Sequence, residues 1–272
     1  MKQAFRTLVS QMPADGTLVA AVNHAGVRDV VAGAPCRVVG YGPGDEGAPA
    51  WRARRIAVEA GGTGFDVERP GGPALRVTAP MFGAFNVENA LAALATVGTL
   101  GVPLEEAAPA LERFRGVKRR QEVRGEVRGV LVLDDFAHHP TAVSGTVGAV
   151  RARFPGRRIV AVFEPRTNTS RRAVFQADYV QALRGADRVV IAEPPPGAVY
   201  SATGRVTEFL SVDAVARELR AAGVEAEVLP GADAIAARLA ASCAPGDVVL
   251  VMSNGGFGNV WEKLLEALAG RH

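Results

Sequence analysis

The side chains best suited to chemistry gather in the segment LVLDDFAHHPTAV, residues 131–143. Its apolar start predicts a strand that ends in two carboxylates, and the proline after the two imidazoles suits the first position of a helix. In an open parallel sheet, ligands bind beyond the carboxyl ends of the strands. We therefore expect four side chains to face such a crevice: Asp134, Asp135, His138 and His139.

The same residues also have a purely structural interpretation. His139 or Thr141 can cap the helix that follows, and Asp134 can pair with an arginine. The grouping of all four polar residues at one strand end favours function. A carboxylate beside two adjacent imidazoles does not form a closed set of metal ligands, so we predict no metal site in this segment.

Amides and basic residues precede this segment. APMFGAFNVENALAAL (79–94) places Asn86 and Asn89 three residues apart at the start of a predicted helix. Asparagine caps helices well, but its amide also matches the donor and acceptor edge of a purine. GVKRRQEV (116–123) carries Arg120, which is either solvated or able to reach a phosphate.

Two further segments follow predicted strands. FEPRTNTSRR (163–172) leads into a helix that we predict from residue 171, and polar donors at a helix N-terminus are typical of an anion site. VMSNGGFGNVWEKL (251–264) has glycines that let a substrate approach the backbone, although GGFG lacks the full G-x-G-x-x-G pattern. The candidate substrate-binding residues are His139, Arg166, Asn168, Thr169, Ser170, Ser253, Asn254 and Gly255.

Strands and helices are predicted to alternate from residue 130 onward. Apolar runs indicate strands, and amphipathic patterns between them indicate helices. Near-continuous apolar strands of this kind are typical of an α/β fold with a Rossmann-like, doubly wound, mostly parallel sheet. The predicted strands are 130–134, 158–163, 188–192, 225–229 and 247–252, and the predicted helices are 140–153, 171–184, 211–222, 232–243 and 257–269.

The first part of the chain has a different pattern. Short predicted strands at 17–22, 36–42, 53–60, 64–69 and 74–80 are followed by helices at 86–100 and 103–114. Turns rich in glycine and proline separate these strands. We predict part of a second α/β domain at 1–120 and a complete domain at 121–272, with the boundary in the arginine-rich connector 115–125.

The composition excludes several classes of protein. The net charge is only +3 and the basic residues are dispersed, so we expect no nucleic-acid partner. No apolar run approaches the roughly 20 residues of a membrane span, and the start lacks the apolar core of a signal peptide. We therefore expect a cytoplasmic protein without a membrane partner. Cys36 and Cys243 are expected to be isolated thiols.

Taken together and in this order, FGAFNVENALAA, GVKRRQEV and LDDFAHHPTAV resemble the Mur ligase family along nearly the whole chain. DDFAHHPT is similar to the members that act on UDP-N-acetylmuramate. VFEPRTNTSRR and VMSNGGFG resemble the branch that joins the tripeptide L-Ala-γ-D-Glu-meso-diaminopimelate to this substrate in peptidoglycan recycling. The L-alanine-adding ligases are the alternative within the family. A non-catalytic nucleotide- or peptide-binding module is the alternative outside the enzymes.

This resemblance implies an ATP-dependent ligase that activates a carboxylate as an acyl phosphate before an amine attacks it. Its substrates would be UDP-N-acetylmuramate and the tripeptide. The resemblance implies that Asn86 and Asn89 contact adenine, Asp135 the ribose and Arg120 the phosphates. His138 would lie near the reacting centre, so His138 and Arg120 are the catalytic candidates.

The sequence departs from the family pattern in two ways. Phe85 stands where the family's helix motif has a histidine. No G-x-x-x-x-G-K-[ST] loop occurs in the sequence, and the family carries that loop and its Mg²⁺ ligands upstream of the part that this chain resembles. We therefore expect the C-terminal portion of a ligase that uses ATP and Mg²⁺, and we expect this portion alone to be inactive.

Overall fold

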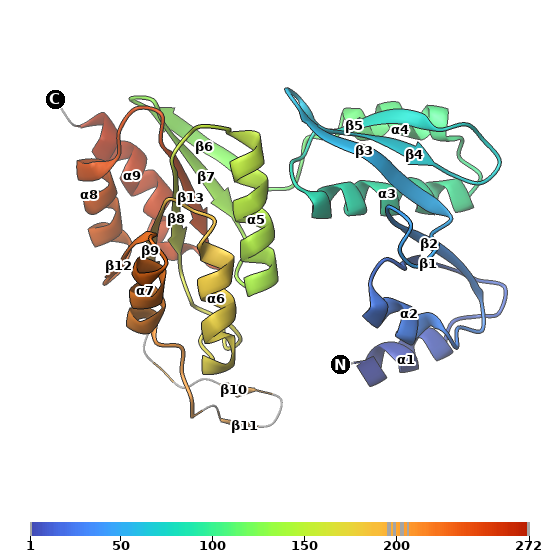
Figure 1. The fold of residues 1–272 in the computed structure, drawn as a ribbon, viewed down its shortest axis with the longest axis horizontal. Helices are drawn as coiled ribbons and strands as arrows, with labels where there is room; N and C mark the ends of the chain where they lie inside the picture. The colour runs from blue at the N-terminus through green and yellow to red at the C-terminus, as the bar shows by residue number, and fades with distance from the viewer. Residues whose placement is uncertain (1, 195–196, 198–199, 202–203, 206, 271–272) are drawn as a thin grey trace. The chain divides into compact units, whose positions relative to one another are not determined.

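The chain forms two separate compact units in the computed structural model, Met1–Gly116 and Val117–His272. The structure describes residues 2–194, 197, 200–201, 204–205 and 207–270. Figure 1 shows each unit as a sheet with helices packed on it.

The first unit contains one five-stranded sheet of order β1-β2-β3-β4-β5. Strands β1 to β3 are parallel, whereas β3, β4 and β5 pair antiparallel. The elements are α1 (Lys2–Ser10), β1 (Thr17–Ala21), α2 (Ala25–Val31), β2 (Arg37–Pro43), β3 (Trp51–Glu59), β4 (Gly62–Glu68), β5 (Leu75–Ala79), α3 (Ala84–Thr99) and α4 (Leu104–Glu112).

Alternation along the strands builds the core of this unit. Trp51 and Ala53 on β3, and Phe65 and Val67 on β4, lie on one face of the sheet and pack with apolar residues of α3 and α4. Leu91 of α3 is fully buried in this cluster. The apolar face that alternation gives the strands therefore packs against the apolar stripe of α3 in one core.

The second unit contains a six-stranded sheet of order β12-β9-β8-β13-β7-β6, in which only β6 runs antiparallel to its neighbour. A short antiparallel pair, β10 and β11, lies outside it. The elements are β6 (Glu122–Val127), β7 (Val130–Asp135), α5 (Pro140–Arg153), β8 (Ile159–Phe163), η1 (Ala173–Phe175), α6 (Gln176–Leu183), β9 (Arg188–Ala192), β10 (Tyr200–Ser201), β11 (Gly204–Arg205), α7 (Val212–Ala221), β12 (Glu225–Leu229), α8 (Ala232–Ser242), β13 (Val248–Met252), η2 (Phe257–Asn259) and α9 (Val260–Ala269).

Helices cover both faces of this sheet, as expected for a doubly wound fold. Figure 1 shows α5 and α6 on one side and α8 and α9 on the other, and buried residues of α7 pack in the same core as those of α5 and α6. Leu131 and Leu133 of β7 belong to the core with α5 to α7, whereas Val130 and Val132 belong to the core with α8 and α9. Because strand side chains alternate, the next two residues, Asp134 and Asp135, must also point to opposite faces.

The predicted fold class is confirmed. Each end of the five predicted parallel strands lies within one residue of its position in the structure. Five short elements were missed: α1, α2, β6, β10 and β11. The helix predicted from residue 171 begins with the 3-10 helix η1 at Ala173 and becomes α-helical (α6) at Gln176. Residues 167–171 form a turn, because Arg171 N donates to the Thr167 carbonyl without continuing into a helix.

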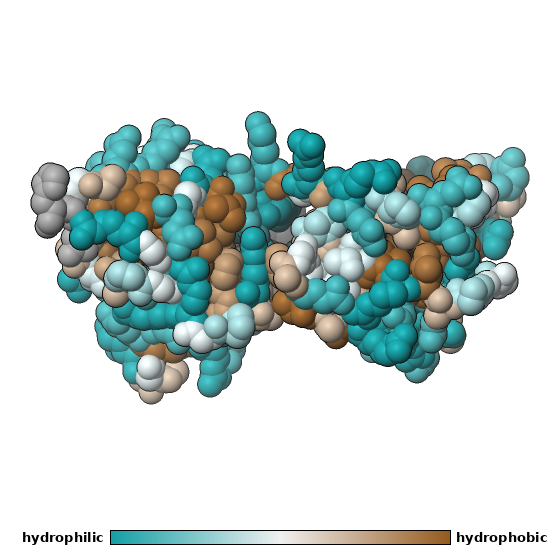
Figure 2. Space-filling model, turned by 90° about the horizontal axis from the view of Figure 1, so that it is seen from above, coloured by the Kyte–Doolittle hydropathy of each residue, from teal (hydrophilic) through white to brown (hydrophobic). Residues whose placement is uncertain are grey.

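Both cysteines are free thiols, as predicted. In the part of the chain that the structure describes, no helix is both long enough and apolar enough to span a bilayer. On the face shown in Figure 2, hydrophobic residues are interspersed with hydrophilic ones.

Candidate functional site

Three neighbouring strands of the second unit end at one edge of the sheet. Met252 of β13 pairs with Asp135 of β7 on one side and with Phe163 of β8 on the other. Backbone hydrogen bonds continue this pairing one step further, from Ser253 N to the Asp135 carbonyl and from Glu164 N to the Met252 carbonyl. The segments that follow these strands therefore meet at the carboxyl edge, where a doubly wound sheet binds its ligands.

Asp134 is buried on the face of α9. Its Oδ2 accepts a hydrogen bond from Arg119 Nε at 3.1 Å, and its Oδ1 has no partner among the described residues. Burial raises the pKa of Asp134 above its usual value, and the Arg119 guanidinium opposes that shift. The structure therefore contains the pairing of Asp134 with an arginine that was the structural interpretation of the sequence. The expectation that Asp134 faces a crevice is wrong, because strand alternation turns it into the sheet–helix interface.

Asp135 is buried on the opposite face and holds the turn that follows β7. Its Oδ1 accepts from Ala137 N at 2.7 Å, and its Oδ2 accepts from Gln121 N at 2.9 Å. Thr146 Oγ1 of α5 donates to Oδ1 as well, at 3.4 Å. Burial raises the pKa of Asp135, and these hydrogen bonds oppose the shift. Like Asp134, Asp135 does not face an open crevice within this unit.

The two histidines lie in the turn between β7 and α5. His139 is exposed, and its Nδ1 accepts from Thr141 N at 3.3 Å, so it is the N-cap of α5. His138 is half-buried, and its ring lies 3.0 Å from the Phe136 carbonyl through Nδ1. The hydroxyl of the buried Tyr179 donates to the His138 carbonyl at 2.6 Å. The turn is thus held by α6, a contact that no sequence motif indicated.

The two arginines of the connector have different environments. Arg119 donates to Asp134 and, at 2.7 Å through Nη2, to the Ser253 carbonyl. Arg120 is exposed, and its guanidinium lies 5.5 Å from the centre of the Phe136 ring. Arg120 makes no hydrogen bond or ion pair with the described residues. Arg120 therefore has a free guanidinium beside the turn after β7, whereas Arg119 ties strand ends together.

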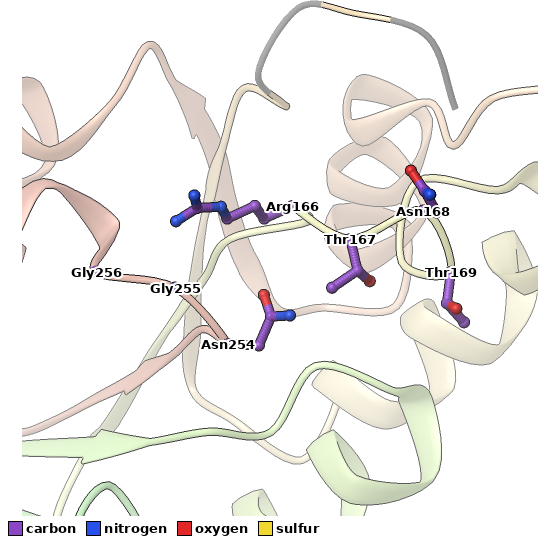
Figure 3. Close-up of a pocket in the computed structure, with 7 residues that line it drawn as sticks. All are labelled: Arg166, Thr167, Asn168, Thr169, Asn254, Gly255 and Gly256. Carbon is purple, nitrogen blue, oxygen red and sulfur yellow. The ribbon is translucent and has the colours of Figure 1, made fainter. Parts of the chain in front are cut away.

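An open polar hollow of about 760 Å³ lies where the segments after β8 and β13 meet. Figure 3 shows its seven lining residues, with the Arg166 side chain directed toward Gly255 and Gly256. Arg166 is exposed, and within the described part of the chain it forms no ion pair with Glu164 or Glu193. Arg166 therefore does not brace the loop through such an ion pair.

The turn after β8 holds itself together. Thr167 N donates to Ser170 Oγ at 2.9 Å, and Ser170 N donates to Thr167 Oγ1 at 3.0 Å. Ser170 is fully buried, whereas Asn168 and Thr169 are exposed. The placement of Asn168, Thr169 and Ser170 at a helix N-terminus is wrong, because their turn ends at residue 171, before the short 3-10 helix η1 that leads into α6.

The segment after β13 is also fixed from within. Ser253 is fully buried, and its hydroxyl donates to Glu164 and accepts from Gly255 N at 2.9 Å. Asn254 is half-buried and lines the hollow, and its Oδ1 has no partner among the described residues. Sequence reasoning missed Glu164, although its position directly after β8 was the available signal.

In the first unit, the two asparagines lie in the first two turns of α3. Asn86 Nδ2 donates to the Phe82 carbonyl at 2.8 Å, and Asn89 Nδ2 lies 3.4 Å from Asn86 Oδ1. The helix cap is Gly83, so neither asparagine is the cap. Their side chains lie on one face of α3, with Asn89 exposed.

A cluster beside these asparagines was missed by sequence reasoning. Glu88 of α3 accepts from Asn23 Nδ2 at 3.0 Å and lies 3.0 Å from His24 Nε2. Asn23 and His24 follow β1, at the carboxyl end of a parallel strand. Within the described residues, no three histidine, cysteine, aspartate or glutamate side chains gather into a possible metal site.

Two family models match the chain. One, described as the Mur ligase middle domain, matches residues 1–97. The other, described as Mur ligase, glutamate ligase domain, matches residues 119–255, which is half of the chain. The chain belongs to the Mur ligase family. The predicted family is thereby confirmed, and the two matches lie on either side of the division between the two structural units.

Curated relatives of this Mur ligase chain include UDP-N-acetylmuramate–L-alanine ligases. The one from Burkholderia cenocepacia J2315 is 36% identical over 98% of this chain and 57% of that ligase. The one from Caldanaerobacter subterraneus subsp. tengcongensis is 32% identical over 98% of this chain and 56% of that ligase. The chain therefore spans little more than half the length of these relatives.

Solved structures with this fold include two Mur ligases. A murein peptide ligase from Psychrobacter arcticus 273-4 is 29% identical, covers 100% of this chain with 55% of its own, and has a TM-score of 0.72. A UDP-N-acetylmuramate-alanine ligase from Thermotoga maritima is 21% identical, covers 97% of this chain with 54% of its own, and has a TM-score of 0.74. The second shows the shared fold alone.

Proposed function

We propose that this chain is part of an ATP-dependent ligase that joins an amine to the carboxylate of UDP-N-acetylmuramate through an acyl phosphate. Membership of the Mur ligase family supports the reaction class. Such a reaction needs groups that orient ATP and neutralise phosphate charge as it grows. Within the described residues, no three histidine, cysteine, aspartate or glutamate side chains gather into a site that could hold the magnesium ion.

For the nucleotide, we propose that Asn86 and Asn89 contact adenine and that Arg120 contacts the phosphates. The exposed amide of Asn89 and the unpaired guanidinium of Arg120 support these roles. His138, half-buried in the turn after β7, is proposed to lie near the reacting centre. Because both oxygens of Asp135 accept hydrogen bonds within the unit, we propose that Asp135 shapes this turn rather than binding the ribose.

For the amine substrate, we propose that Arg166, Asn168, Thr169 and Asn254 line the binding hollow. We also propose that the exposed His139, in the turn after β7, contacts the substrate. Ser170 and Ser253 are fully buried, so we propose that they hold the two loops and do not touch the substrate. The observation that carries this proposal is the unpaired guanidinium of Arg166 in a polar hollow. A free guanidinium of this kind suits a carboxylate.

Two amines fit this chemistry. L-alanine is supported by the names of the curated relatives and brings one carboxylate. The tripeptide L-Ala-γ-D-Glu-meso-diaminopimelate is supported by the murein peptide ligase structure and by the size and polarity of the hollow. The sequence relatives favour L-alanine. We propose the tripeptide, because a single small amino acid leaves most of the polar groups around Arg166 without a partner.

The deciding experiment compares the kcat/KM of the two amines in a ligase that contains this chain. Arg166→Ala should weaken use of the tripeptide by about 2–3 kcal/mol, as expected for a charge-assisted hydrogen bond, and should leave the KM for ATP nearly unchanged. Arg184→Ala, which removes an exposed arginine of the same unit, is the control. A wild-type preference for L-alanine would refute the tripeptide assignment.

A further inference from the structure

Arg166 lies directly against the backbone of Gly255. A Cβ built on Gly255 would lie 1.9 Å from Arg166 Nη1, 2.7 Å from its Cζ and 2.8 Å from its Cδ. These distances are far shorter than the 3.5–4.0 Å of ordinary van der Waals contact. The guanidinium therefore occupies the space that any side chain at position 255 would take (Figure 3).

This contact changes the role expected of the glycine. From the sequence, Gly255 was expected to let a substrate approach the backbone. In the structure, that side of Gly255 is filled by Arg166. The glycine thus serves the arginine, and through it the ligand that the arginine binds.

The loop under Arg166 is fixed. Gly255 N donates to Ser253 Oγ, and the Ser253 hydroxyl donates to the Glu164 carboxylate, which directly precedes Pro165 and Arg166 in the chain. The Ser253 carbonyl also accepts from Arg119 Nη2. Pro165 is buried, so the backbone that enters Arg166 is held as well. If a side chain were added at position 255, the long Arg166 side chain would move more easily than the loop.

We infer that Gly255 is a specificity-determining position. Together with the Ser253–Glu164 hydrogen bond, it forms a fixed platform that holds the Arg166 guanidinium in the hollow for a substrate carboxylate. The choice of ligand rests on the proposed function, whereas the dependence of Arg166 on Gly255 rests on the structure alone. Gly255 acts through Arg166 and is a positioning residue.

The chain supplies a matched control at the next position. Around Gly256, a Cβ would meet nothing within 4 Å, and neither glycine has a φ in the left-handed region. Gly255→Ala and Gly256→Ala in the 272-residue chain thus differ in one respect, the collision with Arg166. The Nε–Hε resonance of Arg166, assigned by its loss in Arg166→Ala, should shift in Gly255→Ala and stay in place in Gly256→Ala. An unmoved resonance in Gly255→Ala overturns the inference.

Binding of the tripeptide by the same proteins tests the ligand. Arg166→Ala and Gly255→Ala should each weaken binding by about ten- to a hundredfold, the effect of one charged hydrogen bond. Gly148→Ala, at an exposed glycine of α5 outside the hollow where a Cβ would meet nothing within 4 Å, should bind like the wild type. The double variant Arg166→Ala/Gly255→Ala should bind no more weakly than Arg166→Ala alone, because both changes remove the same contact. Additive losses would mean that Gly255 acts independently of Arg166 and would overturn the inference.

The two proposals fail separately in this series. If the wild-type chain binds L-alanine and not the tripeptide, the proposed amine is wrong. The inference is then decided with L-alanine as the ligand, and it stands only if Gly255→Ala and Arg166→Ala weaken L-alanine binding equally. If Arg166 moves in Gly255→Ala while binding of the preferred amine is unchanged, the platform has no role in recognition and the inference is overturned.

Discussion

Arg119 and Arg120 are neighbours in the sequence, but we expect them to contribute differently to the stability of the second unit. Arg119 compensates the buried carboxylate of Asp134, whose other oxygen has no partner among the described residues. Removing one member of a buried ion pair leaves an uncompensated charge and costs roughly 3 kcal/mol. We therefore predict that Arg119→Ala lowers the free energy of unfolding of the second unit by about that amount, measured by urea denaturation.

Arg120→Ala is the matched comparison. Its guanidinium is exposed, lies beside the Phe136 ring and makes no hydrogen bond or ion pair with the described residues, so the free energy of unfolding should change by no more than about 0.5 kcal/mol. In the intact ligase, the same change should lower kcat more than it raises the KM for ATP, because charge on the phosphates grows during transfer. Equal destabilisation by the two substitutions would contradict this division of roles.

Residue types revealed the candidate site, but their partners did not follow from the sequence. The paired aspartates at 134 and 135 were found because a carboxylate is rare at the end of an apolar strand. Their opposite directions follow from strand alternation, yet the choice of Arg119 over Arg120 depends on a backbone path that no pattern encodes. Likewise, Gly255 was recognised as a close approach, whereas the group that approaches it, Arg166, comes from another strand end.

At the scale of elements, Tyr179 links α6 to the turn that carries both histidines. Its ring is fully buried and its hydroxyl donates to the His138 carbonyl. Tyr179→Phe keeps the shape and leaves that carbonyl without this donor, so it should lower the free energy of unfolding by about 1–3 kcal/mol. The NMR signals of the His138 and His139 rings should shift as the turn relaxes.

Tyr41→Phe is the control for this substitution. Tyr41 is partly buried, and its hydroxyl makes no hydrogen bond with the described residues. It should therefore cost less stability and leave the two histidine signals unchanged. If the two variants were equally stable and both preserved the histidine signals, the Tyr179 hydrogen bond would not position the turn.

Long periodic elements were predictable, and short ones were not. The strands β7, β8, β9 and β13 are fully buried, so their apolar runs were unmistakable in the sequence. The first helix residue of α6 was misplaced by five positions, because Thr167 and Ser170 satisfy each other's backbone groups in a closed turn. Local side-chain hydrogen bonds of this kind compete with a helix start. The short helices α1 and α2 lack an apolar stripe long enough to be distinguished from a loop.

At the scale of the whole molecule, the two units differ in how folding shifts the pKa values of their carboxyl groups. In the first unit, arginine or lysine partners lower the pKa of Asp29, Asp45, Glu59 and Asp66. The pKa of Glu105 is lowered by a hydrogen bond from its own backbone N–H and then by Arg69. The second unit also has carboxyls with lowered pKa values: Glu122, Asp187 and Glu227. It differs in containing Asp134 and Asp135, whose pKa values are raised by burial.

These shifts have opposite effects on stability in acid. A carboxyl whose pKa is lower in the folded state stabilises the fold above its unfolded pKa, and that stabilisation is lost as the pH falls through the folded value. A carboxyl whose pKa is raised by folding behaves in the reverse sense, because the protonated form is the one that burial favours. Acidification below about pH 4, the usual range of carboxyl pKa values, should therefore weaken the first unit more than the second.

The chain contains the probes for this prediction, since Trp51 lies buried in the first unit and Trp261 lies buried in the second. Trp261→Phe leaves a fluorescent reporter in the first unit only, and Trp51→Phe leaves one in the second only. Urea unfolding of each variant between pH 7 and pH 3 should show a steeper loss of stability at Trp51 than at Trp261. Because the pairs of the first unit are exposed and salt screens them, about 1 M NaCl should reduce that difference. A steeper loss at Trp261 would mean that burial of Asp134 and Asp135 does not offset the ion pairs of the second unit.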